Sequence, residues 1–424
     1  MRSHPAPINP ATTKAWTDDP ALLLRQHADD ILQQRDRIHE RSSEFYFQET
    51  MEMCLTFAHL YRYYHHEPYL AYVQDLLLRC LESLQEDHLG AGLCGGVSGF
   101  LWLYHHLRRM ELIDASFPSV KDIEDLVIAS LQQDFEAGDY DLLGGFAGKA
   151  VALLEAPVNR KRHKALTAVV TQLEQMEITD AEGGLYWLDL DFDNGSKAVI
   201  NLGLAHGMPS LIILLCKIHA AGIAIRKSKK LIMQSVQWLL RQEVYSETAS
   251  FPPFLGYGGP ARLAWCYGDL GIAFALLHAA AAMDMPRWRD EAIRIALKST
   301  QRRLDDAGVA RHPSAPLHDI SFCHGTSGLA HMYHRLFQAT SVKAFDQAAN
   351  YWYDLTFSIE KSDRFLAGYP FFFYNETGEE VMFMENFTLL NGLPGILLAL
   401  HSRITNTKLH WDTCLLTDLS MPVS

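Results

Sequence analysis

The feature that most constrains the fold of this chain is a short glycine motif that recurs along its length. Two glycines separated by two residues precede an apolar run in five places: GGVSGFLWLYHHL, GGFAGKAVALL, YGDLGIAFALL, HGTSGLAHMYH and NGLPGILLALH. A sixth copy, HGMPSLIILL, has Ser210 in place of the second glycine. The first glycines of the six copies are Gly96, Gly145, Gly207, Gly268, Gly325 and Gly392. Because each interval can hold one pair of helices with its loops, the spacing predicts a repeat protein.

Two kinds of helix are expected to alternate in this repeat. In residues 160–177, Leu166, Val169 and Leu173 fall on one helical face, as in an amphipathic helix. The same spacing recurs in residues 228–242, 289–306 and 342–360. The runs after the glycines are apolar on nearly all sides, which is typical of fully buried helices. The alternation predicts an all-α fold, an α/α toroid of six to seven helical hairpins with an amphipathic outer ring and a buried inner ring.

Some segments depart from the repeat. Residues 41–63 lack the glycines but could supply a seventh hairpin that closes the ring. Residues 183–200 and 368–384 alternate in polarity around turn residues, which predicts short β-hairpins or extended loops. Residues 1–40 are interpreted as an N-terminal extension, with a loose Pro-rich start and a first helix, and residues 41–424 as a single toroid domain.

Composition excludes several classes of partner. The formal net charge of −13 argues against nucleic acid, because phosphate binding needs clustered Lys and Arg. No apolar run reaches the roughly 20 residues of a membrane span, so we expect no integral membrane protein. The seven cysteines form an odd set without the spacing of a disulfide framework, and reduced thiols inside the cell are the simplest interpretation.

The residues beside the glycines are expected to face one shared cavity, because the motifs converge at one end of the toroid. They are His206, Cys266 and the adjacent pair Cys323 and His324. Two thiols and an imidazole form a set that suits zinc, and three protein ligands would leave a fourth position open. A cysteine before a helix is often only structural, and His206 could be either a fourth ligand or an acid/base group.

Three strings at these positions, NLGLAHG (201–207), AWCYGDLG (264–271) and CHGTSGL (323–329), resemble the lanthionine synthetase C-like proteins, the cyclases of lanthipeptide biosynthesis. The resemblance implies an α/α toroid and a zinc ion held by Cys266, Cys323 and His324. It also matches active-site positions of the family to a further set of residues: Asp141, His206, Arg262 and Tyr267. Three of these have a simpler alternative, since Asp141 could cap a helix, Arg262 could pair with acidic surface groups and Tyr267 could serve packing alone.

The resemblance implies a zinc-dependent enzyme that adds a cysteine thiolate to dehydroalanine or dehydrobutyrine in a dehydrated precursor peptide, forming (methyl)lanthionine thioether rings. In that chemistry His206 is the candidate proton donor to the α-carbon, and Arg262 could stabilise the enolate oxygen. Asp141 could fix the tautomer of His206. The implied partners are a leader-bearing precursor peptide, a separate dehydratase and, as an option, a membrane exporter beside which a cytoplasmic enzyme would work.

Other functions stay open at this level. The same thiolate chemistry could act on a small thiol such as glutathione. A non-catalytic scaffold that holds a peptide or glutathione would have a closed zinc site with His206 as a ligand. Other α/α toroids are zinc prenyltransferases or glycosidases, but the sequence has no convincing Asp-x-Cys string and no obvious acid pair beyond Asp141 and Asp269 at the glycine motifs.

Overall fold

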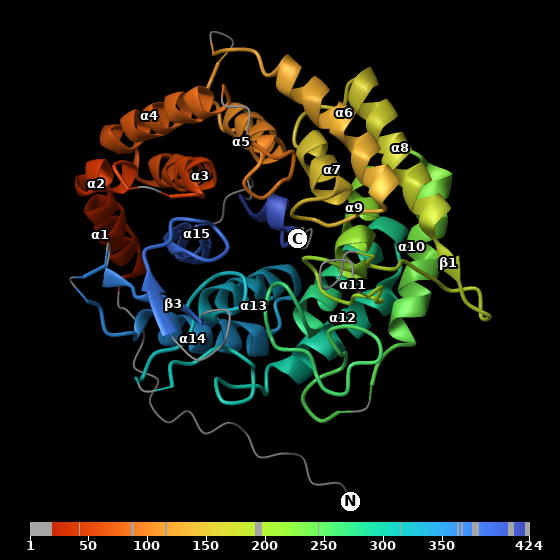
Figure 1. Ribbon diagram of the computed structural model, residues 1–424. Helices are drawn as coiled ribbons and strands as arrows, with labels where there is room; N and C mark the ends of the chain where they lie inside the picture. Colours follow the sequence, from red (N-terminus) through yellow and green to blue (C-terminus); the bar gives the residue numbers. More distant parts are fainter. Residues whose placement is uncertain are drawn as a thin grey trace, which may run out of the picture.

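The computed structural model describes residues 19–419, except residues 42, 86–88, 115–116, 191–196, 245, 314, 363, 366–367, 375–380 and 406–410. Its helices form two concentric rings (Figure 1). The inner ring consists of α3 (Tyr46–Tyr64), α5 (Val97–Arg109), α7 (Phe146–Leu154), α9 (Met208–Ala220), α11 (Asp269–Met283), α13 (Thr326–Thr340) and α15 (Leu393–Ile404). The outer ring consists of α4 (Glu67–Ser83), α6 (Lys121–Ala137), α8 (Arg160–Met176), α10 (Ile225–Leu240), α12 (Pro286–Ser299) and α14 (Lys343–Phe357). The predicted α/α toroid is confirmed.

The N-terminal helices complete the outer ring. Helix α1 (Pro20–Gln33) packs against α15, and the short α2 (Arg35–His39) follows it. Asp19 caps α1 through its carboxylate, which accepts a hydrogen bond from the Leu22 N–H at 2.9 Å. The loose start expected for residues 1–14 lies outside the described residues. The domain boundary at residue 40 stays a prediction.

The glycine motifs fold each loop tightly over the start of the inner helix that follows it. A Cβ atom on Gly328 would lie 1.8 Å from the carbonyl oxygen of Phe322, so no larger residue fits there. In the sixth copy, the Ser210 hydroxyl is buried and donates to the Gly207 carbonyl oxygen at 2.8 Å. Close backbone approach therefore explains why glycine recurs at these positions.

Backbone hydrogen bonds join consecutive loops of the repeats. They run from Cys94 N to Leu143 O (3.0 Å), Leu142 N to Ala205 O (3.3 Å), Ala205 N to Cys266 O (3.3 Å), Cys266 N to Cys323 O (3.3 Å) and Cys323 N to Leu390 O (2.8 Å). The loops that carry the predicted site residues are thus connected directly to one another.

Helix α3 closes this chain of hydrogen bonds with side chains, because it has no glycine loop before it. The Glu52 carboxylate accepts the Leu389 N–H at 2.5 Å. The Gln48 amide donates to Glu52 at 3.1 Å and to the Cys94 sulfur at 3.1 Å. A seventh hairpin is present, but residues 41–63 supply only its inner helix α3, and its outer helix α4 (Glu67–Ser83) lies beyond that range.

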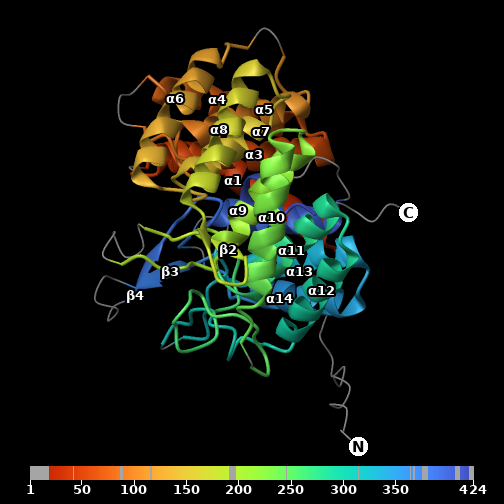
Figure 2. The same ribbon diagram turned by 90° about the vertical axis from the view of Figure 1, so that its right-hand side faces the viewer.

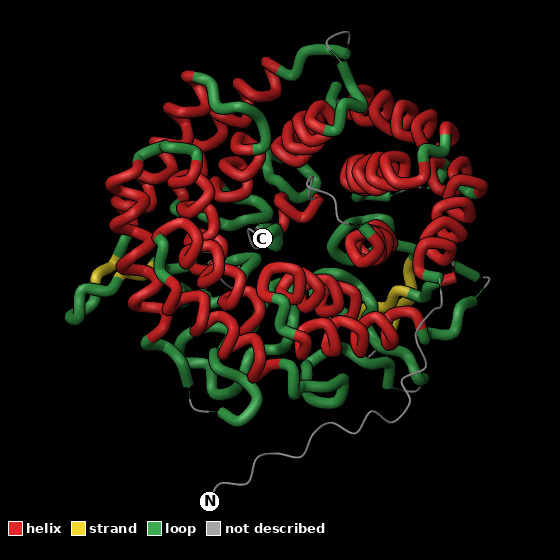
Figure 3. The backbone as a smooth tube through the Cα atoms, turned by 180° about the vertical axis from the view of Figure 1, so that it is seen from behind, coloured by secondary structure: helices red, strands yellow, loops and turns green. Residues whose placement is uncertain are grey.

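Strand structure lies near the periphery of the helical rings (Figure 3). Strands β1 (Ile178–Thr179) and β2 (Leu185–Tyr186) pair antiparallel, as do β3 (Phe371–Tyr374) and β4 (Val381–Met384). The segment 183–200 was expected to be extended. Its β2 pairs with β1, and Asp189 forms an isolated antiparallel bridge with Val199. Figure 2 shows β2, β3 and β4 on one side of the ring.

The C-terminal 3-10 helix η2 (Trp411–Leu415) is held by a buried charge cluster. Both carboxylate oxygens of Asp412 accept hydrogen bonds from the Arg335 guanidinium at 2.9 Å. His331 also bonds to Asp412, at 2.8 Å. None of the helices in the described part of the chain is long and apolar enough to span a membrane.

Candidate functional site

Asp141 and His206, on the loops before α7 and α9, form a hydrogen-bonded pair. Oδ2 of Asp141 faces Nδ1 of His206. Oδ1 of Asp141 accepts the N–H groups of Leu143 at 2.7 Å and Gly144 at 2.9 Å. Asp141 therefore orders the loop before α7 and orients His206 at the same time. Because an ionised carboxylate only accepts hydrogen bonds, Nδ1 carries the proton, and Nε2 is left to exchange one.

The pKa of His206 reflects opposing effects. Burial alone would lower it, but the hydrogen bond and negative charge of Asp141 raise it, with smaller contributions from Cys266 and Asp189. The net result is a pKa above the ordinary value. The side chain is 38% exposed, so a molecule entering from solvent can reach the imidazole.

Tyr267 lies beside His206, with their ring centroids 6.3 Å apart. The Asn201 amide donates to the Tyr267 hydroxyl at 3.3 Å and to the Asp189 carboxylate at 2.9 Å. Asn201 is fully buried and also accepts the Gly203 N–H at 2.9 Å, so its amide is held in place. Sequence reasoning singled out Tyr267 and missed Asn201.

Cys266 and Cys323 lie on loops joined by a backbone hydrogen bond, and their thiols act on each other's pKa. The Cys323 thiol lowers the pKa of Cys266, and the charges of His324, Arg262 and His206 act in the same direction. The pKa of Cys323 is raised, first by the Cys266 thiol and then by burial. Of the two thiols, Cys266 therefore loses its proton first.

His324 is oriented by a carboxylate in the same way as His206. Its Nδ1 lies 2.5 Å from Oδ2 of Asp319 and 3.2 Å from the Ser321 hydroxyl. Burial lowers the pKa of His324, but the Asp319 hydrogen bond and charge outweigh it and raise the pKa. Sequence reasoning missed Asp319. With Nδ1 engaged, Nε2 of His324 is the nitrogen available to a ligand.

The chemistry of Cys266, Cys323 and His324 fits a zinc ion. Two thiols on hydrogen-bonded loops and an imidazole backed by a carboxylate are the donor types of catalytic zinc sites. Within the described residues, no three His, Cys, Asp or Glu side chains already stand in positions that would hold a metal ion. The zinc site therefore stays a prediction.

Arg262 lies on the loop before α11, four residues before Cys266. Its side chain is exposed, and its positive charge lowers the pKa values of both Cys266 and Cys323. The structure thus brings Arg262 within electrostatic range of the thiols, while the pair of Asp141 and His206 lies on the neighbouring loops. Whether these residues act in catalysis stays a prediction.

Comparison with known proteins gives the family. Residues 53–416 match the family model described as lanthionine synthetase C-like protein. The chain belongs to the lanthionine synthetase C-like family. It is 23% identical over 288 residues to the nisin biosynthesis protein NisC of Lactococcus lactis subsp. lactis, a match that covers 61% of this chain and 65% of that protein.

A solved structure supports the fold of this lanthionine synthetase C-like protein. The structure, titled nisin cyclase, superposes with a TM-score of 0.72 at 19% sequence identity, covering 93% of this chain and 97% of that one. At that identity the likeness shows the toroid fold alone. The aligned segment spans just under two thirds of the length of NisC.

Proposed function

We propose that this protein is a zinc-dependent lanthipeptide cyclase that closes thioether rings in a dehydrated precursor peptide. The observation that carries the proposal is that the carboxylate-oriented His206 and the cysteines Cys266 and Cys323 lie on loops that are hydrogen-bonded to one another. Membership of the family supports it. The addition of a thiol to an activated alkene needs a group that keeps the attacking sulfur deprotonated and a proton donor beside it.

The first part of the proposal concerns the substrate thiol. Zinc bound by Cys266, Cys323 and His324 would supply a Lewis acid that keeps this thiol deprotonated at neutral pH. Asp319 would keep His324 in the tautomer that binds through Nε2, because its carboxylate faces Nδ1. The deprotonated sulfur is the nucleophile.

The second part concerns the proton that completes the addition. The substrate sulfur forms a bond to the β-carbon of dehydroalanine or dehydrobutyrine, and the π electrons move toward the carbonyl oxygen. Nε2 of His206 then delivers a proton to the α-carbon, and the Asp141 carboxylate stabilises the imidazolium beforehand. The Arg262 guanidinium, which is exposed, would hold the negative oxygen. The substrate thiol loses one proton, and this proton restores the one that His206 gives to the α-carbon. No atom is gained or lost overall, so the addition is an isomerisation of the peptide.

The proposal also concerns partners. The substrate must already carry dehydrated residues, so a separate dehydratase would act first on a precursor peptide with a leader. A cytoplasmic location, beside an exporter of the finished peptide, would follow from that order of steps.

The test is ring closure by the purified protein on a dehydrated peptide that contains one cysteine. Because the addition leaves the mass unchanged, ring closure is read as loss of the cysteine that N-ethylmaleimide can label. We expect Cys323→Ala to lose zinc and activity together, and His206→Ala to keep zinc and lose ring closure. Cys216→Ala, at a buried cysteine outside the site, is the matched control and should keep both.

Two results would contradict the proposal. Loss of zinc in His206→Ala would place His206 on the metal, as the scaffold alternative requires. A peptide whose mass increases by one glutathione, when glutathione is supplied and no ring forms, would assign the chemistry to a small thiol.

A further inference from the structure

The Asn201 side chain, on the loop before α9, has an amide whose orientation is fixed by its neighbours. Its oxygen accepts the Gly203 N–H at 2.9 Å, and its nitrogen donates to the Asp189 carboxylate at 2.9 Å. The reverse orientation would set two donors against each other at Gly203 and two acceptors against each other at Asp189. Because Asn201 is also fully buried, its amide nitrogen must face Asp189 and Tyr267.

This orientation fixes the direction of the hydrogen bond to Tyr267. The Asn201 amide nitrogen lies 3.3 Å from the Tyr267 hydroxyl oxygen. Because an amide nitrogen can only donate, the hydroxyl oxygen accepts in this bond, and its own hydrogen is left for another partner. Among the described residues, no acceptor for that hydrogen is found. Tyr267 therefore presents a hydrogen-bond donor that the described part of the chain does not use.

The Tyr267 ring is held in place beside the imidazole of His206. A Cβ atom on Gly203 would lie 2.7 Å from both Cδ1 and Cε1 of the ring, so the ring lies directly against the Gly203 main chain. Its centroid is 6.3 Å from that of His206, and the side chain is half-buried. Asn201 thus holds both the main chain that supports the ring and the hydroxyl at the end of the ring.

The proposed ring closure needs a donor of this kind. Negative charge develops on the carbonyl oxygen of the dehydrated residue as the sulfur adds, and a donor that is already fixed stabilises such an oxygen most effectively. We infer that Asn201 is a positioning residue, which makes the Tyr267 hydroxyl a hydrogen-bond donor to that oxygen while His206 protonates the α-carbon. Tyr267 keeps its proton throughout, so the balance of the addition is unchanged. This inference rests on the proposed function, which supplies the oxygen.

The test replaces the Asn201 amide by a carboxyl group of the same shape. An amide has two N–H hydrogens, whereas a carboxyl group has at most one, so the side chain in Asn201→Asp cannot donate to both Asp189 and Tyr267. With that hydrogen on the Asp189 side, the Tyr267 hydroxyl can only donate to the new carboxyl oxygen, and its hydrogen is lost to the substrate. The turn itself should survive, because Asp139 and Asp319 form it at the equivalent positions of other repeats.

Ring closure is measured over a range of concentrations of the dehydrated peptide with one cysteine. We expect Asn201→Asp and Tyr267→Phe each to lower kcat by about 10²-fold, as the loss of one such donor does. KM should stay near that of the parent, because the bond strengthens only as charge develops, and zinc content should be unchanged. The variant with both substitutions should be no slower than Tyr267→Phe alone, because the amide acts only through the hydroxyl.

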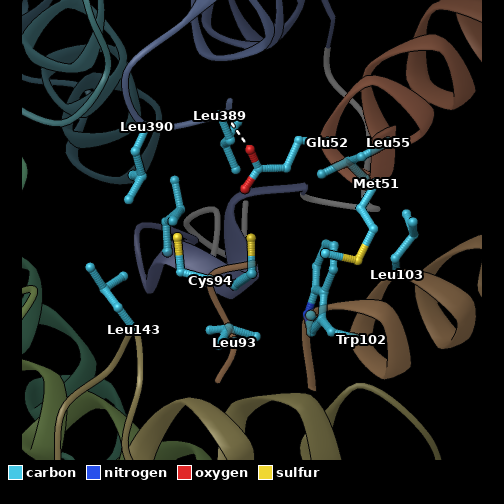
Figure 4. A pocket seen from close by; sticks show the side chains of 13 residues that line it. Met51, Glu52, Leu55, Leu93, Cys94, Trp102, Leu103, Leu143, Leu389 and Leu390 are labelled. Atoms are coloured by element: carbon cyan, nitrogen blue, oxygen red, sulfur yellow. Dashed lines mark hydrogen bonds between the residues drawn. The ribbon is translucent and has the colours of Figure 1, made fainter. Parts of the chain in front are cut away.

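Asn386 provides a matched control on the loop before α15. Its oxygen accepts the Thr388 N–H at 2.8 Å, in the same turn. Within the described part of the chain, its amide nitrogen contacts only the sulfur of Met384, at 3.9 Å. The loop continues to Leu389, whose N–H bonds to Glu52 of α3 (Figure 4). Asn386→Asp changes the same group without touching Tyr267, so it should keep the kcat and KM of the parent.

Several results would overturn the inference while the parent protein still closes rings. One is a parent-like kcat in Asn201→Asp or in Tyr267→Phe. Another is losses that multiply when the two substitutions are combined, because Asn201 would then act by a route other than Tyr267. If circular dichroism shows that Asn201→Asp does not fold, an unchanged kcat in Tyr267→Phe still refutes the donor. A parent protein that closes no ring would reject the proposed function, and this inference with it.

Discussion

Glu52 links α3 to the loop before α15, and its ionisation should make the stability of the ring depend on pH. Burial raises the pKa of this carboxyl to about 8 from its usual 4.5, although the hydrogen bonds from Leu389 and Gln48 oppose the shift. The charged form is thus disfavoured in the folded protein. Glu52→Gln keeps an acceptor for the Leu389 N–H and removes the titration.

The size and sign of the effect follow from linkage. A pKa difference of about 3.5 between 4.5 and 8 corresponds to at most about 5 kcal/mol, at about 1.36 kcal/mol per unit. Because the folded-state pKa is the higher one, the folded protein binds the proton more tightly than the unfolded chain does. The stabilising contribution is therefore fully present below about pH 4.5 and is lost as the pH rises to about 8.

The assay is urea denaturation of the parent protein and of Glu52→Gln at pH 5.5 and at pH 8. We expect the free energy of unfolding of Glu52→Gln to rise relative to the parent by about 2–3 kcal/mol between these two values, the part of the shift that falls inside this window. Glu82→Gln, on an exposed position of α4, is the control and should show no such change. A difference between the parent and Glu52→Gln that stays constant with pH would refute the reasoning.

Three further predictions concern other parts of the molecule. Asp141→Asn should lower ring closure by about 10²–10⁴-fold, because His206 loses the carboxylate that fixes its tautomer, and zinc content should be unchanged; activity near the parent level would leave Asp141 with only its loop role. Gly328→Ala should lower the melting temperature, measured by circular dichroism, because its Cβ would clash with a backbone carbonyl; an unchanged melting temperature would contradict the close approach. Asp412→Ala should cost about 3–5 kcal/mol in urea denaturation because it leaves the buried Arg335 charge unpaired, and a loss below 1 kcal/mol would reject this.

Much of the fold could be predicted because its signals are periodic. The glycine motif marks where each inner helix begins, and the polarity of each helix separates the inner ring from the outer one. Even α3, which lacks the glycines, falls in the segment 41–63 that was expected to contribute to a seventh hairpin, although the outer helix α4 was not located. The way in which α3 joins the ring could not be predicted, because Glu52 bonds to Leu389, 337 residues away in the sequence. Side-chain pairing over such a separation leaves no local pattern.

The candidate site was predicted in the residues that stand next to the glycines, and its supporting residues were missed. The sequence left Asp141 with two alternatives, a cap or a site residue, and the structure shows that it has loop contacts and a contact with His206 together. Sequence spacing could not decide between these two roles, because Asp141 has both. One carboxylate oxygen accepts loop N–H groups, and the other contacts His206. Asn201 and Asp319 were missed because a lone Asn or Asp in a loop is most often only a turn residue.

A repeated position explains why these supporting residues stand where they do. Six residues before the first glycine, Asp139, Asn201, Asp319 and Asn386 each accept the N–H of the residue two positions on. Their main-chain carbonyl oxygens also accept the first N–H of the inner helix that follows. This turn is the structural role of the position, and Asn201 and Asp319 add a second bond that holds Tyr267 and His324.

Arg262 occupies the same position before α11 and departs from the pattern. It has no side-chain oxygen to form the turn, Gly268 after it adopts a φ of +100°, and its guanidinium is exposed near the thiols. Because Arg262 does not form the turn that the other residues at this position form, its presence calls for a different explanation. Its positive charge, which acts on the thiols, provides one. Replacement by asparagine would restore the repeat pattern, so Arg262→Asn should fold at least as well as the parent while ring closure falls. Loss of folding instead, seen as a lower melting temperature, would show that Arg262 serves the loop and not the reaction.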